Sequence, residues 1–225
     1  MGFAHIYIKQ MIISTANTTE STDLATSIVA EFAGGQSSDV QMMIGVGIVK
    51  DSDAVFFQYV GDEQAPRALT LPTSGKPLTR LQNVTLSGLS VARDIGEFKS
   101  TKLNLFLTTA QGRTLMLTSG LTTIWSQCVL TSLMGLYNSY NITEPFTLDS
   151  WKGNSKMRPC FAAVRQSGTK VSDQALYDQL KDLRGDRAYD KLESVMIDSI
   201  EILNAAVGIE NAEVAEVTES TDDQF

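Results

Sequence analysis

A two-residue alternation of apolar and polar side chains over residues 81–120 constrains the fold of this chain more than any other feature. It runs through LQNVTLSGLSVARDI (81–95), FKSTKLNLFLTT (98–109) and RTLMLTSG (113–120). In the second segment three leucines share one face, whereas Lys102 and Phe106 share the other. This period predicts antiparallel strands that have one face on a core and the other in solvent.

Two further apolar segments precede this region. VQMMIGVGIVKD (40–51) and AVFFQYVG (54–61) are separated by the turn-type cluster Asp51-Ser52-Asp53, and together they predict a hairpin. The two glycines of IGVGIV indicate a bulge or a strongly coiled strand. Residues 61–79 contain three of the five prolines of the chain and predict a long loop.

The hydrophobic period changes to three and four residues after Gly120. Apolar side chains recur from Ile124 to Tyr137, which predicts an amphipathic helix over about residues 121–138, capped near Thr122. Trp125 belongs to the apolar stripe of this helix and is expected in the core. Strand patterns return in EPFTLDSWKG and RPCFAAVRQSG, and helical patterns follow from Ser172.

These elements predict a mainly β chain with helices, of the α+β class. One helix placed late among about five strands suits an OB-like antiparallel Greek-key barrel with an inserted helix. A generic α+β sandwich is the alternative, because a sequence does not define strand pairing. We expect an N-terminal extension with a short helix (1–35), the barrel core (36–171), a C-terminal helical segment (172–207) and a disordered acidic tail (208–225).

Several functional classes find little support in the residues. No apolar stretch approaches the roughly 20 residues that span a bilayer, and the opening residues predict no secretory signal, so we expect a cytoplasmic protein. Cys128 and Cys160, the only cysteines, are expected to be free buried thiols. His5 is the only histidine, and no nucleotide-binding glycine motif is complete, so we predict no enzyme, metal or cofactor.

The net charge of −8 is unevenly distributed along the chain. From Leu192 to Phe225 there are nine acids and no lysine or arginine. Between Lys76 and Lys170, in contrast, eleven bases accompany four acids. A basic middle joined to an acidic end favours a polyanionic partner, with a tail that competes for the same surface.

Aromatic and basic residues alternate most closely in FTLDSWKGNSKMRPCFAAVRQSGTK (146–170). Rings that stack on bases, beside cations that bind phosphates, are typical of single-stranded nucleic-acid binding. For Phe161 both a core position and a stacking role are open, and Trp151 is expected to be exposed. The predicted nucleic-acid-binding residues are Phe98, Lys99, Lys102, Phe106, Arg113, Trp151, Lys152, Lys156, Arg158, Phe161 and Arg165.

The closing residues TESTDDQF resemble the end of a single-stranded DNA-binding protein of the bacterial and tailed-phage kind. The resemblance implies an OB-fold core and a disordered acidic tail that binds replication and repair proteins. Asp222, Asp223 and Phe225 match the family's tail, whereas Gln224 stands where the bacterial tail has proline.

The expected function is therefore sequence-tolerant binding of single-stranded DNA in replication, recombination or repair. The acidic tail would recruit partners and compete with DNA for the basic surface. The sequence is compatible with either a monomer or a homo-oligomer. The first alternative is a non-enzymatic interaction module, such as a phage accessory or structural protein. The second is a carboxylate-metal nuclease, for which Asp51 with Asp53, and Asp94 with Glu97, are the candidate carboxylates.

Overall fold

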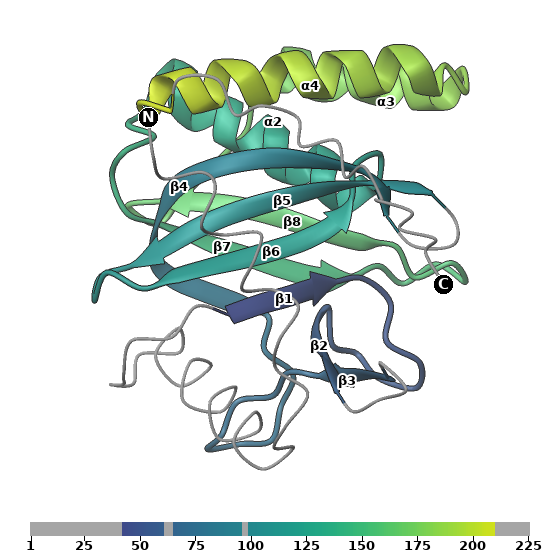
Figure 1. Cartoon of the computed structure of the whole chain (residues 1–225), viewed down its shortest axis with the longest axis vertical. Helices are drawn as coiled ribbons and strands as arrows, with labels where there is room; N and C mark the ends of the chain where they lie inside the picture. Colours follow the sequence, from purple (N-terminus) through teal and green to yellow (C-terminus); the bar gives the residue numbers. More distant parts are fainter. Residues whose placement is uncertain (1–41, 61–64, 96–98, 210–225) are drawn as a thin grey trace, which may run out of the picture.

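The computed structural model describes residues 42–60, 65–95 and 99–209, which form one nine-stranded sheet and three helices (Figure 1). The strands are β1 (Met42–Val46), β2 (Phe56–Val60), β3 (Ala65–Ala68), β4 (Arg80–Ile95), β5 (Ser100–Thr109), β6 (Thr114–Gly120), β7 (Phe146–Lys152), β8 (Cys160–Gln166) and β9 (Thr169–Val171). The helices are α2 (Ile124–Ser139), α3 (Gln174–Gly185) and α4 (Tyr189–Ala206).

The strands lie in the order β3-β2-β1-β6-β5-β4-β7-β8-β9. Every neighbouring pair is antiparallel except β1 and β6, which run parallel. The predicted mixed α+β class is confirmed. The OB-like closed barrel is not confirmed, because the described strands form an open sheet that ends at β3 and β9.

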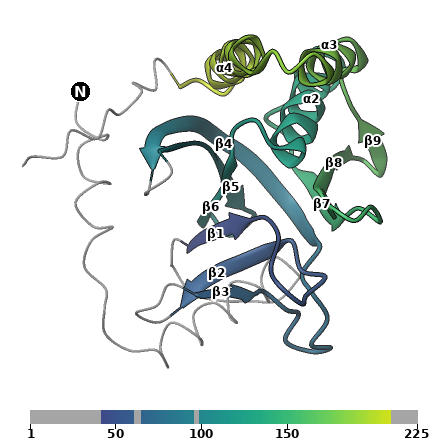
Figure 2. The same cartoon turned by 90° about the vertical axis from the view of Figure 1, so that its right-hand side faces the viewer.

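β4 bends the sheet around the core. This 16-residue strand pairs with β7 near its start and with β5 along the rest of its length. Its register with β5 shifts between Leu86 and Gly88, where the glycine has a φ of 149°, and again between Ala92 and Ile95. Bulges of this kind bend a strand and increase its twist. Figure 2 shows the result, in which β4 arches over β5, β6 and β1 while β7, β8 and β9 lie beside α2.

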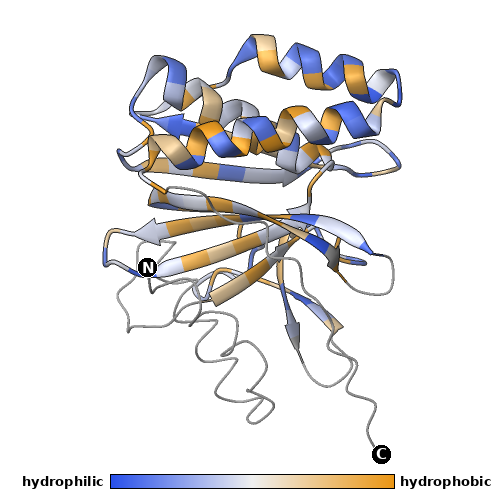
Figure 3. Ribbon diagram, turned by 45° about the horizontal axis from the view of Figure 1, so that its top comes forward, coloured by the Kyte–Doolittle hydropathy of each residue, from blue (hydrophilic) through white to orange (hydrophobic). Residues whose placement is uncertain are grey.

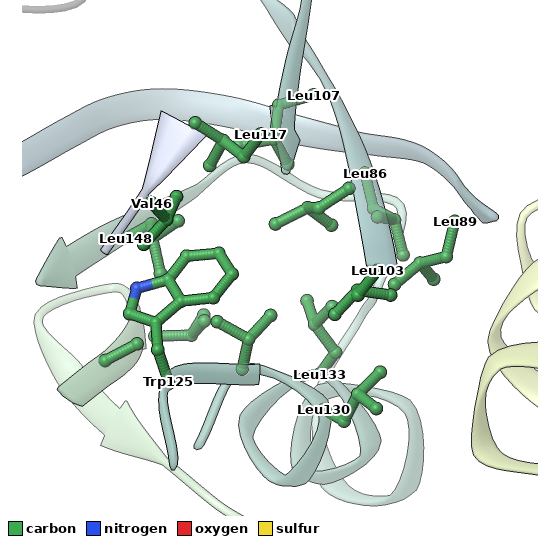
Figure 4. Packing of buried hydrophobic residues seen from close by; sticks show 14 of the residues in the cluster. Val46, Leu86, Leu89, Leu103, Leu107, Leu117, Trp125, Leu130, Leu133 and Leu148 are labelled. Atoms are coloured by element: carbon green, nitrogen blue, oxygen red, sulfur yellow. The ribbon is translucent and has the colours of Figure 1, made fainter. Parts of the chain in front are cut away.

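Helix α2 packs into the concave side of this bent sheet. Its Trp125 is almost fully buried among side chains that include Val46 of β1, Leu117 of β6 and Leu148 of β7 (Figure 4). The indole Nε1–H donates to Ser150 Oγ at 3.0 Å, so the polar atom of this large core residue is paired. The predicted core position of Trp125 is confirmed.

Helices α3 and α4 cover α2 from outside the sheet. Hydrophobic and hydrophilic residues alternate along both (Figure 3), and the apolar stripe of α4 packs against α2 and β4. The Asn204 side chain accepts the Leu89 N–H at 2.8 Å and donates to the Leu89 carbonyl at 2.9 Å. An amide side chain thus satisfies backbone groups of β4 just after its bulge, as a neighbouring strand would.

Several sequence expectations change in detail. Helix α2 begins at Ile124 rather than Leu121, because Thr123, not Thr122, caps it by accepting the Ser126 N–H. The region expected as a loop over residues 61–79 contains β3, where Pro66 is tolerated because β3 is an edge strand. The predicted helix within residues 1–35 and the predicted disorder beyond residue 209 lie outside the described residues.

Gly135 provides a test of the close packing of α2. A Cβ at this position would lie 2.7 Å from the Ser172 carbonyl carbon and 2.9 Å from the Asp173 nitrogen, both of them backbone atoms. We predict that Gly135→Ala lowers the free energy of unfolding by about 1–3 kcal/mol through overpacking.

The measurement is urea unfolding followed by circular dichroism. Gly185→Ala is the matched control, because no neighbouring atom lies within 4 Å of the position that its Cβ would take at the end of α3. This variant should be neutral or slightly stabilising, since alanine favours helix over glycine. Equal stability of the two variants would contradict the proposed contact.

Candidate nucleic-acid interface

The outer face of β7 and β8, turned away from α2, carries the candidate site. Along β7, Leu148 and Ser150 point to the interior and are buried, so the residues between them point outward. Strand register then places outward residues directly opposite one another, in the pairs Thr147 with Arg165, Asp149 with Ala163, and Trp151 with Phe161. We call this surface the β7–β8 outer face.

An aromatic pair occupies one end of the β7–β8 outer face. The Trp151 and Phe161 rings are stacked, with centroids 6.0 Å apart and planes inclined by 19°. Trp151 keeps 41% of its surface exposed, and Phe161 is half-buried beneath it. Gly153 leaves the space for this arrangement, because a Cβ there would lie 2.8 Å from Phe161 Cε2. The pair therefore presents a flat apolar surface to solvent.

Arginines and a shared carboxylate occupy the other end. Asp149 accepts the Nε–H of Arg80 at 2.5 Å on one oxygen and the Nε–H of Arg165 at 2.9 Å on the other. The hydrogen bond with Asp149, and then its negative charge, raise the pKa of Arg80 above its ordinary value. Two arginines therefore share one carboxylate, and Lys170 of β9 is the register partner of Arg165.

A polar pocket of about 360 Å³ opens beside the arginines. Its lining includes Asn83, which has a φ of 52° at an irregularity in the pairing of β4 with β7. On the opposite side lies the β8–β9 turn, where Ser167 and Gly168 both have positive φ. The lining residues are Arg80, Gln82, Asn83, Pro145, Phe146, Thr147, Arg165, Ser167 and Gly168.

The loop that joins β7 to β8 is tied to the loop between β1 and β2. Lys152 donates through Nζ to the carbonyls of Val49 at 3.1 Å and Ser52 at 2.6 Å. Arg158 forms an ion pair of 2.5 Å with Asp53. The hydrogen bond from Arg158, and then the positive charge of Arg158, hold the pKa of Asp53 below its ordinary value. Both cations thus anchor the loop next to the aromatic pair, and Lys156 is exposed within that loop.

The structure separates the remaining predicted residues from this face. Lys102 and Phe106 share the outer side of β5, as the alternation indicates. However, Lys102 pairs with Ala92 near the end of β4, whereas Arg80 is the first residue of that strand. That separation along β4 is about 40 Å. Lys99 is exposed in the turn just before β5. Arg113 is only 6% exposed, so it does not share the surface of the other cations.

Some members of the predicted set lie outside the described residues, namely Phe98, Asp222, Asp223 and Phe225. Conversely, sequence reasoning missed Arg80, Asp149 and Lys170 as members of the site. Arg165 was predicted from the alternation of aromatic and basic residues, whereas the sequence signal for Asp149 was its place in an alternating segment. Their register, and the contribution of β4, came from the fold.

In the described part of the chain, no three His, Cys, Asp or Glu side chains form a cluster that could hold a metal ion. Across the same residues no helix is long and apolar enough to cross a membrane. Cys128 and Cys160 are free, as predicted; Cys160 is buried, whereas Cys128 is only half-buried. Burial is the main cause that raises the pKa of each thiol.

No protein-family model matches the chain, and neither the curated proteins nor the solved structures contain a significant match.

The raised thiol pKa values lead to a prediction about reactivity. Because the thiolate is the reactive form, Cys128 and Cys160 should react much more slowly with a disulfide reagent at pH 8 than free cysteine does. In urea both should react at the rate of the free amino acid. Absorbance after addition of 5,5′-dithiobis(2-nitrobenzoate) measures both rates, and a rapid reaction of both thiols in the native protein would contradict the burial.

Proposed function

We propose that this protein binds single-stranded DNA on the β7–β8 outer face, with little sequence preference. The observation that carries the proposal is the exposed Trp151, stacked on Phe161 in the same strand pair that bears Arg165. A ring available for stacking beside cations is the combination that single-stranded nucleic acids require. Bases would stack on Trp151, and the phosphates that follow would reach the arginines.

The register supports an anionic ligand. Arg165 and Lys170 lie directly opposite each other, and like charges in such positions destabilise a sheet. Local arrangements that oppose folding are expected mainly at functional sites. Along β8, Phe161 and Arg165 are four residues apart, which is about 13 Å, so aromatic and basic groups are spaced along a surface that an extended strand can follow.

We also propose the remaining parts of the expected function. The curved sheet would bind DNA as an OB fold does, in a non-enzymatic role in replication, recombination or repair in the cytoplasm. Partner proteins would bind the tail through Asp222, Asp223 and Phe225. The described fold is compatible with such a role because the β7–β8 outer face is open to solvent. The proposal does not require closure of the sheet into a barrel.

A specific observation favours interaction with another protein as the second candidate. Met43, Met116 and Phe106 form one rung across β1, β6 and β5 on the outer side of the sheet, and Met43 is exposed. Exposed apolar rows of this kind are typical of interaction surfaces. On this reading the chain is an accessory or assembly module, and nucleic acid would not bind.

Trp151 is the first residue to test. We predict that Trp151→Ala weakens binding of an oligo-dT of about 30 nucleotides by about 5- to 150-fold, since each stacked base contributes about 1–3 kcal/mol. Fluorescence anisotropy of the labelled oligonucleotide measures the affinity, with a matched duplex as a comparison. Tyr189→Ala removes a more exposed aromatic from α4 and should leave affinity unchanged. Failure of the wild-type protein to bind would exclude the proposed function.

The tail is tested separately. If the acidic end competes with DNA, a chain that stops at Asn211 should bind oligo-dT more tightly, and the gain should diminish at high salt because screening weakens the competing charges. The same anisotropy titration at low and high salt measures both effects. Unchanged affinity and salt dependence would contradict the competition, although not the site on β7 and β8.

A further inference from the structure

Arg80 and Arg165, the two arginines beside the pocket, are oriented by Asp149 but keep hydrogen-bond donors available for a ligand. Each donates only its Nε–H, and both of these bonds go to Asp149. Across the described residues, neither guanidinium makes another hydrogen bond or ion pair, so the Nη groups of both remain available. About half of each side chain is exposed. A guanidinium with free Nη groups can bind a phosphate through two parallel hydrogen bonds.

Asp149 is well placed to orient both of them. It lies on β7 between the strands that carry the arginines, and its side chain is only 14% exposed. Its register partner on β8 is the small Ala163, which leaves room above the strand for the Arg165 side chain to reach the carboxylate diagonally. With both oxygens engaged, the carboxylate fixes the positions of two otherwise flexible cations.

The pocket beside this triad has the composition of an anion site. Among the described residues, Arg80 and Arg165 are the charged side chains of the lining, and Gln82, Asn83, Thr147 and Ser167 add amide and hydroxyl groups. Asp149 is not part of the lining. The volume of about 360 Å³ is at the lower end of the range for small-ligand sites, which admits one nucleotide unit.

We propose that Arg80 and Arg165 form a phosphate subsite in this pocket, and that Asp149 is its positioning residue. The inference rests on the proposed function, and it assigns to the nucleic-acid strand a phosphate bound by both guanidinium groups. The stacked base lies on Trp151, and the phosphate of a neighbouring nucleotide enters the pocket. A carboxylate inside an anion-binding surface then strengthens binding, because the orientation it imposes outweighs its repulsion.

A positioning role of Asp149 and a simple effect of net charge predict opposite results for Asp149→Asn. If only net charge mattered, Asp149→Asn would remove a negative charge and tighten binding of oligo-dT. If Asp149 positions the arginines, the same change weakens binding by about three- to tenfold. Glu144→Gln is the matched control, because it changes the charge equally in the segment just before β7. Among the described residues, the Glu144 side chain makes no hydrogen bond or ion pair, and only its backbone carbonyl accepts, from Gln166. It should leave the affinity unchanged or tighten it slightly.

The arginines themselves give the second readout. Arg80→Ala and Arg165→Ala should each weaken oligo-dT binding about tenfold and lower the slope of log affinity against log salt by about one. Arg80→Lys and Arg165→Lys keep the charge but lose the planar fork, so they should also weaken binding. Thermal unfolding shows whether Asp149→Asn still folds. If it does not, the lysine variants are the deciding test, and wild-type affinity in them would overturn the subsite.

The outcomes distinguish the subsite from the function on which it rests. Loss of affinity in Trp151→Ala, with wild-type affinity in the arginine variants, would overturn the subsite and leave DNA binding intact. Tighter binding of Asp149→Asn would overturn the positioning role. A 5′-phosphorylated oligo-dT that binds no better than the 5′-hydroxyl form assigns the subsite to an internal phosphodiester, and a clear preference for it assigns a terminal phosphate.

A probe without bases completes the test. Inorganic pyrophosphate should shift the ¹H–¹⁵N signals of Arg80 and Arg165 Nε in the full chain, and the shifts should decrease in Asp149→Asn. If pyrophosphate shifts both signals although oligo-dT does not bind, the anion subsite stands and the proposed function fails. If neither ligand has an effect, both are overturned.

Discussion

The hydrogen bond from Trp125 to Ser150 joins α2 to β7 inside the core, and the exposed surface follows from it. Ser150 and Leu148 must face the interior to meet the indole and its neighbours. Because successive strand residues point to opposite sides, Asp149 and Trp151 are then forced outward. A shift of β7 by one residue would bury a carboxylate and expose the leucine, so the core determines which side chains the site can use.

The bend of β4 also determines how the site is built. The start of the strand supplies Arg80 to the carboxylate on β7, while its later part builds the sheet with β5 and lies under α4. Its two irregularities with β5 let a single strand serve both sides of the core. The Asn204 side chain satisfies the backbone of Leu89 within this stretch. The basic end of the outer face is thus positioned by the same strand that closes the core.

The proposed function and the proposed phosphate subsite depend on different groups. Stacking requires the ring of Trp151, which Phe161 supports from below. Phosphate binding requires two guanidinium groups whose orientation is set by Asp149. Preorganised groups lose less conformational freedom on binding, which is why cations held by a carboxylate can be more effective than free ones. The cations of the loop after β7 have a different role, since Lys152 and Arg158 bind loop carbonyls and Asp53.

Local pattern in the sequence determined the strands from Arg80 to Gly120, the α2 helix to within three residues, the buried Trp125, the free thiols and the exposed Trp151. Side-chain period and turn residues encode these features over a few positions, so no long-range information is needed. Only the tertiary structure decided the open strand order, the edge strand with Pro66, and the grouping of Arg80 with Asp149. Those features depend on pairing between segments far apart in the chain. Pairing is set by the shared core rather than by either segment alone, and local sequence does not record it.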